Sequence, residues 1–320
     1  MDIEYLLFLQ ALRETAPQWI NAFLSFVSEV AVSPANMLVP AIFYWAINKK
    51  DGEFLLLGTG LARSFNSLIK NIACVYRPWI RDPRVKSSLM KTATGYSFPS
   101  GHSALASAGY GGVGAVLSRK KKWLFAVLLI PCFITMFARN WVGAHTPQDV
   151  LVGFCSGMFS LWVVSKILKY IEAHPEHENR IVLIALIATA AALAFQALKS
   201  YPMDVGADGK LLADPKSMLN DTFIDTGVLF GGLIGWWFER KFIRFEIKGT
   251  TMTKVLRCLI GAALFYLICL EGYKHILIMA FSDHWGRFAV GVNWSLFITV
   301  IYPFLFSSIE KMLANKSKES

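Results

Sequence analysis

Residues 98–117 read FPSGHSALASAGYGGVGAVL, and this stretch predicts a turn that opens a helix. Pro99 fixes one backbone angle, Ser100 is a favoured N-cap residue, and Gly101 lets the backbone approach a ligand closely. A helix that starts here points free N–H groups and the positive end of its dipole at the space above its first turn. We therefore expect an anion site at this helix start, with His102 beside it.

The composition places this helix in a membrane. The chain has 320 residues, of which 55% are hydrophobic, whereas soluble domains are about 45–50% apolar. Several apolar runs approach or exceed the length of about 18 residues that indicates a membrane-spanning helix. We therefore predict an all-α, polytopic transmembrane helical bundle. No cleavable signal peptide is expected, because Asp2 and Glu4 stand where basic residues would precede an apolar core.

The apolar runs predict about nine spans. A short amphipathic stretch, 3–13, is expected in the membrane interface, and so is a second apolar segment, 274–281. The first span is interrupted at Ser33-Pro34. The expected spans are 17–48, 53–75, 100–117, 123–139, 147–168, 180–199, 222–238, 254–271 and 288–310.

The basic residues predict how the spans are oriented. The net charge of +10 does not indicate nucleic acid here, because most basic residues fall between apolar runs. Lys49-Lys50, the run 119–122 and Lys166 with Lys169 share one side if the spans alternate, and this side is expected to be cytoplasmic. Segments 76–99 and 140–146 then share the outer side. The arginines in 76–99 break the positive-inside rule, and an anionic ligand would explain them.

Two further clusters fall on that outer side. Lys70 and Arg77 are seven residues apart, about two helical turns, so both project from one face. A cation within a span usually faces a partner or a water-filled site. In the second cluster, His145 precedes Asp149 by four residues, so the carboxylate can reach one imidazole nitrogen. The alternative interpretation of Asp149 is a simple capping box with Thr146.

Together the clusters favour phosphoryl transfer without a metal. Cations and backbone amides would hold the phosphate oxygens, one histidine would attack, and the other would protonate the leaving oxygen. No grouping of carboxylates or of Cys and His suits a metal. We therefore expect neither a metal nor another cofactor.

The three clusters resemble the motifs of the type-2 phosphatidic acid phosphatase superfamily. That pattern is K-x6-R-P, then P-S-G-H, then S-R-x5-H-x3-D, and the likeness covers about residues 17–170. One departure is Ala138, where the family usually has Ser, which removes a hydroxyl contact to phosphate. The matching residues are Lys70, Arg77-Pro78, Pro99-Ser100-Gly101-His102, Arg139, His145 and Asp149.

The resemblance implies a role for each matching residue. His145 would be the nucleophile that forms a phosphohistidine, Asp149 would orient it, and His102 would act as general acid and then as base. The expected phosphate-binding residues are Lys70, Arg77, Ser100, Gly101 and Arg139. Residues 1–170 would form the phosphatase core, and 171–320 would form a C-terminal membrane region of about four spans.

The expected activity is that of an integral membrane phosphatase in a bacterial cell or inner membrane, with its site on the extracytoplasmic face. The substrate would be a lipid phosphate: phosphatidic acid, phosphatidylglycerol phosphate, a sphingoid-base phosphate or undecaprenyl pyrophosphate. Three alternatives remain open. They are a phosphatase for a sugar phosphate, similar to glucose-6-phosphatase, a phosphotransferase, and a lipid-phosphate binder or transporter without enzymatic activity.

Arg63 and Asp225 are two of the charged residues that lie within predicted spans but outside the motifs. Arg63 falls on roughly the same face as Lys70, and Asp225 lies in the seventh span. Ionisable groups inside a membrane usually pair with one another. We therefore hypothesise an Arg63–Asp225 pair.

Overall fold

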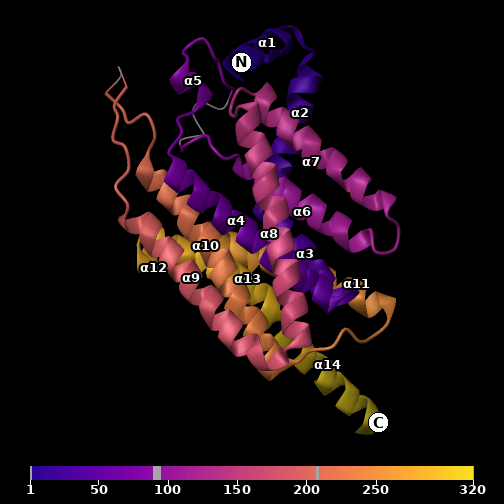
Figure 1. The fold of residues 1–320 in the computed structure, drawn as a ribbon. Helices are drawn as coiled ribbons and strands as arrows, with labels where there is room; N and C mark the ends of the chain where they lie inside the picture. Colours follow the sequence, from indigo (N-terminus) through magenta and orange to yellow (C-terminus); the bar gives the residue numbers. More distant parts are fainter. Residues whose placement is uncertain (1, 89–94, 207–208, 320) are drawn as a thin grey trace.

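The computed structural model describes residues 2–88, 95–206 and 209–319, and within these ranges it is built from helices. The one β-type pairing among them is an isolated bridge between Val205 and Leu211. The predicted all-α bundle is therefore confirmed, and Figure 1 shows long helices packed side by side, with the two termini at opposite ends.

The first half of the chain forms α1 to α8. Their bounds are α1 Asp2–Thr15, α2 Gln18–Val32, η1 Pro34–Met37, α3 Leu38–Ile42, η2 Phe43–Ile47, α4 Lys49–Ala73, α5 Pro78–Arg81, α6 Gly101–Leu117, α7 Trp123–Trp141 and α8 Pro147–Ala173.

The second half continues the bundle. Its elements are η3 Pro175–His177, α9 Glu178–Leu198, α10 Pro215–Phe238, η4 Glu239–Ile243, α11 Thr251–Leu264, η5 Phe265–Gly272, α12 Tyr273–Phe281, α13 Asp283–Leu296, η6 Phe297–Ile301 and α14 Tyr302–Glu319.

Apolar helices long enough to cross a membrane are fewer than the nine predicted spans. Five described helices qualify by length and composition, or six if the pair bent by 48° at Ser33 is one span. The other three predicted spans are α4, α6 and α10. The buried residues of α4 include Arg63, Asn66 and Asn71, so polar side chains that lower its hydropathy face the bundle interior. The predicted number of nine membrane spans is therefore approximate.

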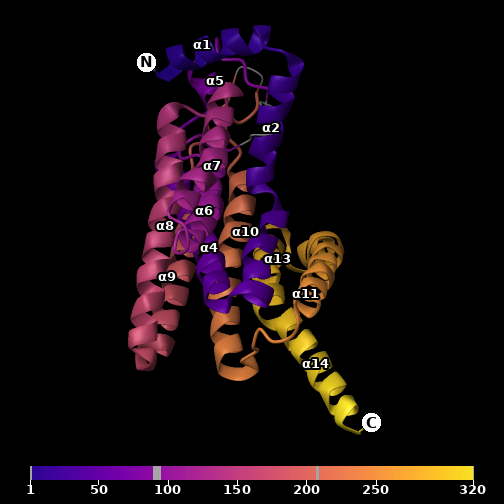
Figure 2. The same ribbon diagram turned by 90° about the vertical axis from the view of Figure 1, so that its right-hand side faces the viewer.

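The two predicted interfacial segments have different outcomes. The predicted segment 274–281 is not separate from the span before it, because α12 continues α11 and η5 in one helix, Thr251–Phe281. The π-helical turns of η5 carry the chain through Gly272 without a break. Helix α1 does lie across one end of the bundle (Figures 1 and 2). There Arg13 donates to the carbonyl of Trp141 at 2.8 Å.

The basic loops and the three motifs lie at opposite ends of the same helices. Lys50 at the start of α4, Arg119 just after α6 and Lys169 near the end of α8 line one cavity of about 350 Å³. Lys70 near the end of α4 and His102 at the start of α6 line another cavity. This separation agrees with the alternation used to orient the spans.

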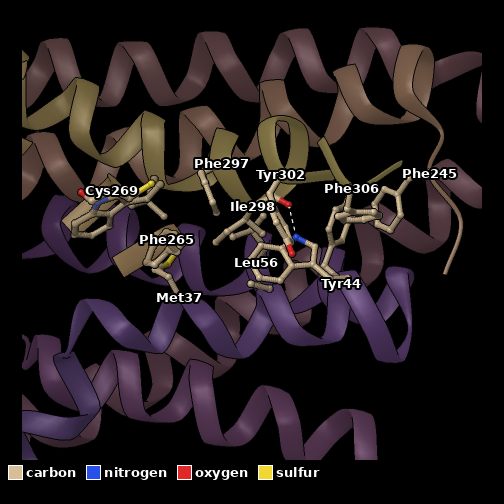
Figure 3. Close-up of a cluster of buried hydrophobic side chains, with 14 of the residues drawn as sticks. Met37, Tyr44, Leu56, Phe245, Phe265, Cys269, Phe297, Ile298, Tyr302 and Phe306 are labelled. Atoms are coloured by element: carbon tan, nitrogen blue, oxygen red, sulfur yellow. Dashed lines mark hydrogen bonds between the residues drawn. The ribbon is translucent and has the colours of Figure 1, made fainter. Parts of the chain in front are cut away.

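A large buried cluster joins the C-terminal helices to the first half of the chain. Aromatic residues of η2 pack against residues of η5, η6 and α14, as Figure 3 shows. At its edge the buried carboxylate of Glu239 accepts hydrogen bonds from the Tyr44 hydroxyl at 3.1 Å and the Phe245 amide at 2.8 Å. It also pairs with Lys49 at 2.6 Å. These contacts pack the two halves into one body.

Small residues let α6 and α8 approach each other closely. A Cβ atom on Gly153 would lie 2.4 Å from the carbonyl oxygen of Ser100, and one on Gly157 would lie 2.4 Å from that of Ala104. Because both neighbours are backbone atoms, they cannot rotate away. The two glycines therefore set the position of the start of α6, where the anion site is expected.

We predict that Gly153→Ala destabilises the protein by about 1–3 kcal/mol, because the added methyl overpacks the contact with Ser100. Thermal unfolding in detergent would measure this loss. Gly109→Ala in α6 is the matched control, since a Cβ there meets nothing within 4 Å. It should be neutral or stabilising by up to about 1 kcal/mol. Equal unfolding temperatures for the two variants would contradict this packing account.

Candidate active site

The three motifs meet around a cavity of about 470 Å³. Its walls come from α2, α4, the start of α6, the end of α7, the loops beside these helices, and the C-terminal helices α10 and α13. Six of the eight predicted site residues line it, and Asp149 and Ser100 lie behind the wall. The lining site residues are Lys70, Arg77, Gly101, His102, Arg139 and His145.

Lys70 holds the loop that leads into α6. Its ammonium donates to the carbonyl oxygens of Tyr96 at 3.0 Å, Ser97 at 3.4 Å and Pro99 at 2.8 Å. An ammonium group has three donors, so these contacts occupy it in the absence of a ligand. The first motif thereby fixes the backbone of the second.

Arg77 connects the first motif to the third. Its guanidinium donates to the carbonyls of Gly95 at 2.8 Å and Ala144 at 3.0 Å. Its Nη1 also lies 3.0 Å from Nε2 of His145. Burial lowers the pKa of Arg77 to about 10, so the side chain remains charged at neutral pH.

Arg139 is the most buried of the three cations, with 2% of its surface exposed. Its Nη1 donates to the hydroxyl of Ser28 on α2 at 2.9 Å. Its Nε has no hydrogen-bond partner among the described residues. Sequence reasoning missed Ser28, whose only signal is that it is a small polar residue in an apolar helix.

Asp149 forms the capping box considered from the sequence and lies close to His145, and its role in orienting that histidine stays a prediction. It closes the capping box, because its carboxylate accepts from the Thr146 amide at 2.8 Å and its own amide donates to the Thr146 hydroxyl. The same oxygen lies 3.6 Å from Nδ1 of His145. The hydroxyl of Ser97, a residue that sequence reasoning missed, donates to this oxygen at 2.5 Å and lies 3.4 Å from Nδ1.

These contacts define the protonation of His145. Arginine is always a donor, so Nε2 of His145 must accept from Arg77 and carries no proton. In the neutral ring the proton is then on Nδ1, which faces Ser97 and Asp149. Burial, followed by the charges of Arg77 and Arg139, lowers the pKa of His145 well below its usual value. The electron pair of Nε2 accepts the hydrogen bond from Arg77 in this state.

The second motif lies at the start of α6, where one residue caps the helix and two others line the cavity. Ser100 is fully buried, and its hydroxyl accepts from the Ser103 amide as the N-cap of α6. It also accepts from the Ser103 hydroxyl at 3.0 Å, so its contact with phosphate stays a prediction. Gly101 and His102 line the cavity directly.

The hypothesis that Arg63 pairs with Asp225 is confirmed. Nη1 of Arg63 lies 2.9 Å from one oxygen of Asp225, and the Ser67 hydroxyl donates to the other oxygen at 2.8 Å. This pair joins α4 to α10 in the cavity wall. No group of three or more His, Cys, Asp or Glu side chains within the described part of the chain is arranged to hold a metal.

Comparison with known proteins gives the family. A model of the PAP2 superfamily matches residues 53–173, and a model of the transmembrane extension of PAP2 superfamily phosphatases matches residues 223–316. The chain belongs to the PAP2 superfamily. It is therefore a membrane-embedded phosphoric ester hydrolase. The PAP2 model spans all three motifs, and the extension model begins in α10.

Two curated relatives carry phosphatase names. Phosphatidylglycerophosphatase B of Bacillus subtilis is 25% identical over 157 residues, which cover 46% of this PAP2 chain and 74% of the relative. Undecaprenyl-diphosphatase of Sulfolobus acidocaldarius is 34% identical over 64 residues, 20% of this chain and 30% of the relative. No solved structure matches the chain.

We predict that Ser97→Ala lowers kcat/KM about tenfold or more, because it removes a hydrogen bond to the carboxylate behind His145. Phosphate release by the purified variant would measure the loss. The control is Ser160→Ala, another buried serine, whose hydroxyl bonds only within α8. An unchanged rate in Ser97→Ala, or the same loss in both variants, would show that Ser97 does not position the histidine.

The lowered pKa of His145 predicts a pH profile. A histidine that must be neutral to act is inactivated as pH falls through its own pKa. The acid limb of kcat/KM should therefore lie below the ordinary histidine value of about 6.5. Arg77→Gln removes a nearby positive charge, so it should move this limb to higher pH. The wild type and Arg77→Gln are compared on one substrate, so titration of the substrate phosphate affects both profiles equally. An acid limb at the same pH in both enzymes would show that it does not report the pKa of His145.

Proposed function

We propose that this protein hydrolyses the phosphomonoester or terminal pyrophosphate of a lipid by a phosphohistidine mechanism without a metal. One observation carries the proposal. His102, His145 and three cations line a single cavity, and the donor Arg77 leaves Nε2 of His145 as an unprotonated ring nitrogen. This combination matches what phosphoryl transfer needs, an unprotonated nucleophile beside fixed positive charge, once Arg77 donates to the phosphoryl group instead of to Nε2.

In the first proposed step, Nε2 of His145 attacks the phosphorus atom and forms a P–N bond. The bond between phosphorus and the leaving oxygen breaks, and His102 gives this oxygen a proton. Arg77, Lys70 and Arg139 stabilise the charge on the phosphoryl oxygens, together with the amides at the start of α6. Asp149 stabilises the proton on Nδ1 as the ring becomes positive.

In the second step, a water molecule attacks the phosphohistidine. His102, now deprotonated, accepts a proton from this water as the new P–O bond forms and the P–N bond breaks. Inorganic phosphate leaves, and both histidines return to their starting states. An acceptor alcohol in place of water would give a phosphotransferase instead.

A lipid substrate is supported by the setting of the cavity. Its walls are membrane helices, so a substrate can keep its tail in the bilayer while its phosphate reaches the site. The names of the two relatives refer to lipid phosphates. The cavity also lies at the end of the bundle away from the basic loops, and we propose that this end is extracytoplasmic.

Phosphate release from detergent-purified protein in EDTA tests the proposal. The substrates are phosphatidic acid, phosphatidylglycerol phosphate, a sphingoid-base phosphate, undecaprenyl pyrophosphate and glucose 6-phosphate. We predict release from at least one lipid, and a loss of about a thousandfold or more in His145→Ala, which lacks the nucleophile.

His284→Ala is the matched control, because this histidine contacts Asn220 and Phe223 and does not line the cavity. It should keep the wild-type rate. Release that EDTA abolishes, release that survives in His145→Ala, or release from glucose 6-phosphate alone would overturn the proposal.

A further inference from the structure

One face of α10 forms the wall of the catalytic cavity opposite the motifs. Met218, Asp221, Thr222 and Asp225 all line it, and their spacing of three, one and three residues puts them on the same side of the helix. α10 belongs mostly to the C-terminal extension and not to the part of the chain that carries the motifs. The extension match begins at residue 223, so the extension contributes Asp225 and, from α13, Trp294 to the cavity, whereas Met218, Asp221 and Thr222 lie just before it.

The two carboxylates on this face differ in their partners, since within the described part of the chain Asp225 is paired and Asp221 is not. Asp225 is neutralised by Arg63 and by the Ser67 hydroxyl. Asp221 is exposed to the cavity and has neither a hydrogen bond nor an ion pair among the described contacts. A free carboxylate accepts hydrogen bonds and does not donate them. In a cavity built for phosphate it would repel a second phosphate joined directly to the first.

A second observation points to a ligand in the same cavity. Asn66 lies one turn before Lys70 on α4, lines the cavity, and is only 4% exposed. Its amide nitrogen has no hydrogen-bond partner among the described residues. Its side-chain oxygen is 3.6 Å from where a Cβ on Gly101 would be, so the amide lies beside the start of α6. A buried donor without a partner is costly unless a ligand satisfies it.

A free hydroxyl group is the chemistry that satisfies both side chains, because it donates one hydrogen bond and accepts others. We propose that Asp221 and Asn66 form a subsite for a hydroxyl on the leaving alcohol, close to the phosphate ester. The subsite selects lipid phosphates whose leaving group is hydroxylated over those whose leaving group is not. This inference rests on the proposed phosphatase function and specifies its substrate class.

The candidate lipids divide on this property. The leaving group of phosphatidylglycerol phosphate carries a free glycerol hydroxyl between the ester and its phosphodiester. The leaving group of a sphingoid-base phosphate carries a hydroxyl and also an ammonium group, which the Asp221 carboxylate would attract, so phosphatidylglycerol phosphate is the test of the hydroxyl itself. The leaving group of phosphatidic acid carries none. In undecaprenyl pyrophosphate the leaving group is a second phosphate, which Asp221 would repel. We therefore expect the first two to be the better substrates.

The test compares kcat/KM for phosphatidylglycerol phosphate, a sphingoid-base phosphate, phosphatidic acid and undecaprenyl pyrophosphate in the same detergent. In the wild type, both hydroxylated substrates should exceed the other two about tenfold or more. Asp221→Ala should reduce the ratio of phosphatidylglycerol phosphate to phosphatidic acid about tenfold. Asp221→Asn, which keeps a carbonyl acceptor and the side-chain size, should keep part of the ratio.

Asp283→Ala is the control, since it removes one negative charge from the exposed start of α13, outside the cavity. Its ratio should equal that of the wild type. A wild-type ratio near one, or a ratio that stays the same in both Asp221 variants, would overturn the subsite and leave the phosphatase intact. No release from any of these lipids by the wild type would overturn the proposed function itself.

Discussion

Three cations around one cavity, two of them buried and one half-buried, are the constraint on which this structure depends. Lys70, Arg77 and Arg139 repel one another, and burial removes the water that would screen them. The protein compensates with backbone carbonyls, five of which accept from Lys70 and Arg77, and with the hydroxyl of Ser28. Arg139 nevertheless retains a buried Nε without a partner among the described residues. A cavity held in this state has a strong preference for an anion.

The fold supplies the rigidity that such a site needs. Gly153 and Gly157 bring α6 and α8 together, so that the helix starts carrying His102 and Asp149 lie side by side, and the Ser100 amide donates to the Asp149 carbonyl at 2.9 Å. The Arg63–Asp225 pair and the aromatic cluster of Figure 3 hold the C-terminal helices against the motif-bearing helices. The extension is thus part of the site, because its helix α10 completes the cavity wall.

Motif spacing and hydropathy predicted the bundle, most helix positions and the six motif residues that line the cavity. They also predicted the Arg63–Asp225 pair, because an ionisable group inside a membrane requires a partner. Ser97 and Ser28 were missed because their roles depend on which way a loop and a helix face, which local spacing does not encode. The roles of Ser100 and Asp221 depend on helix rotation and on packing between distant segments, for which the sequence carries no local signal.

The proposed mechanism requires that Nε2 of His145 becomes phosphorylated during turnover. The most direct measurement is rapid acid-free quenching with a ³²P-labelled lipid substrate, followed by mass spectrometry of the peptide that contains residue 145. We expect an acid-labile, base-stable phosphate on Nε2, since Nδ1 faces Ser97 and Asp149. Phosphate on Nδ1, on His102 or on a hydroxyl or carboxyl group, or turnover with no phosphorylated intermediate, would contradict it.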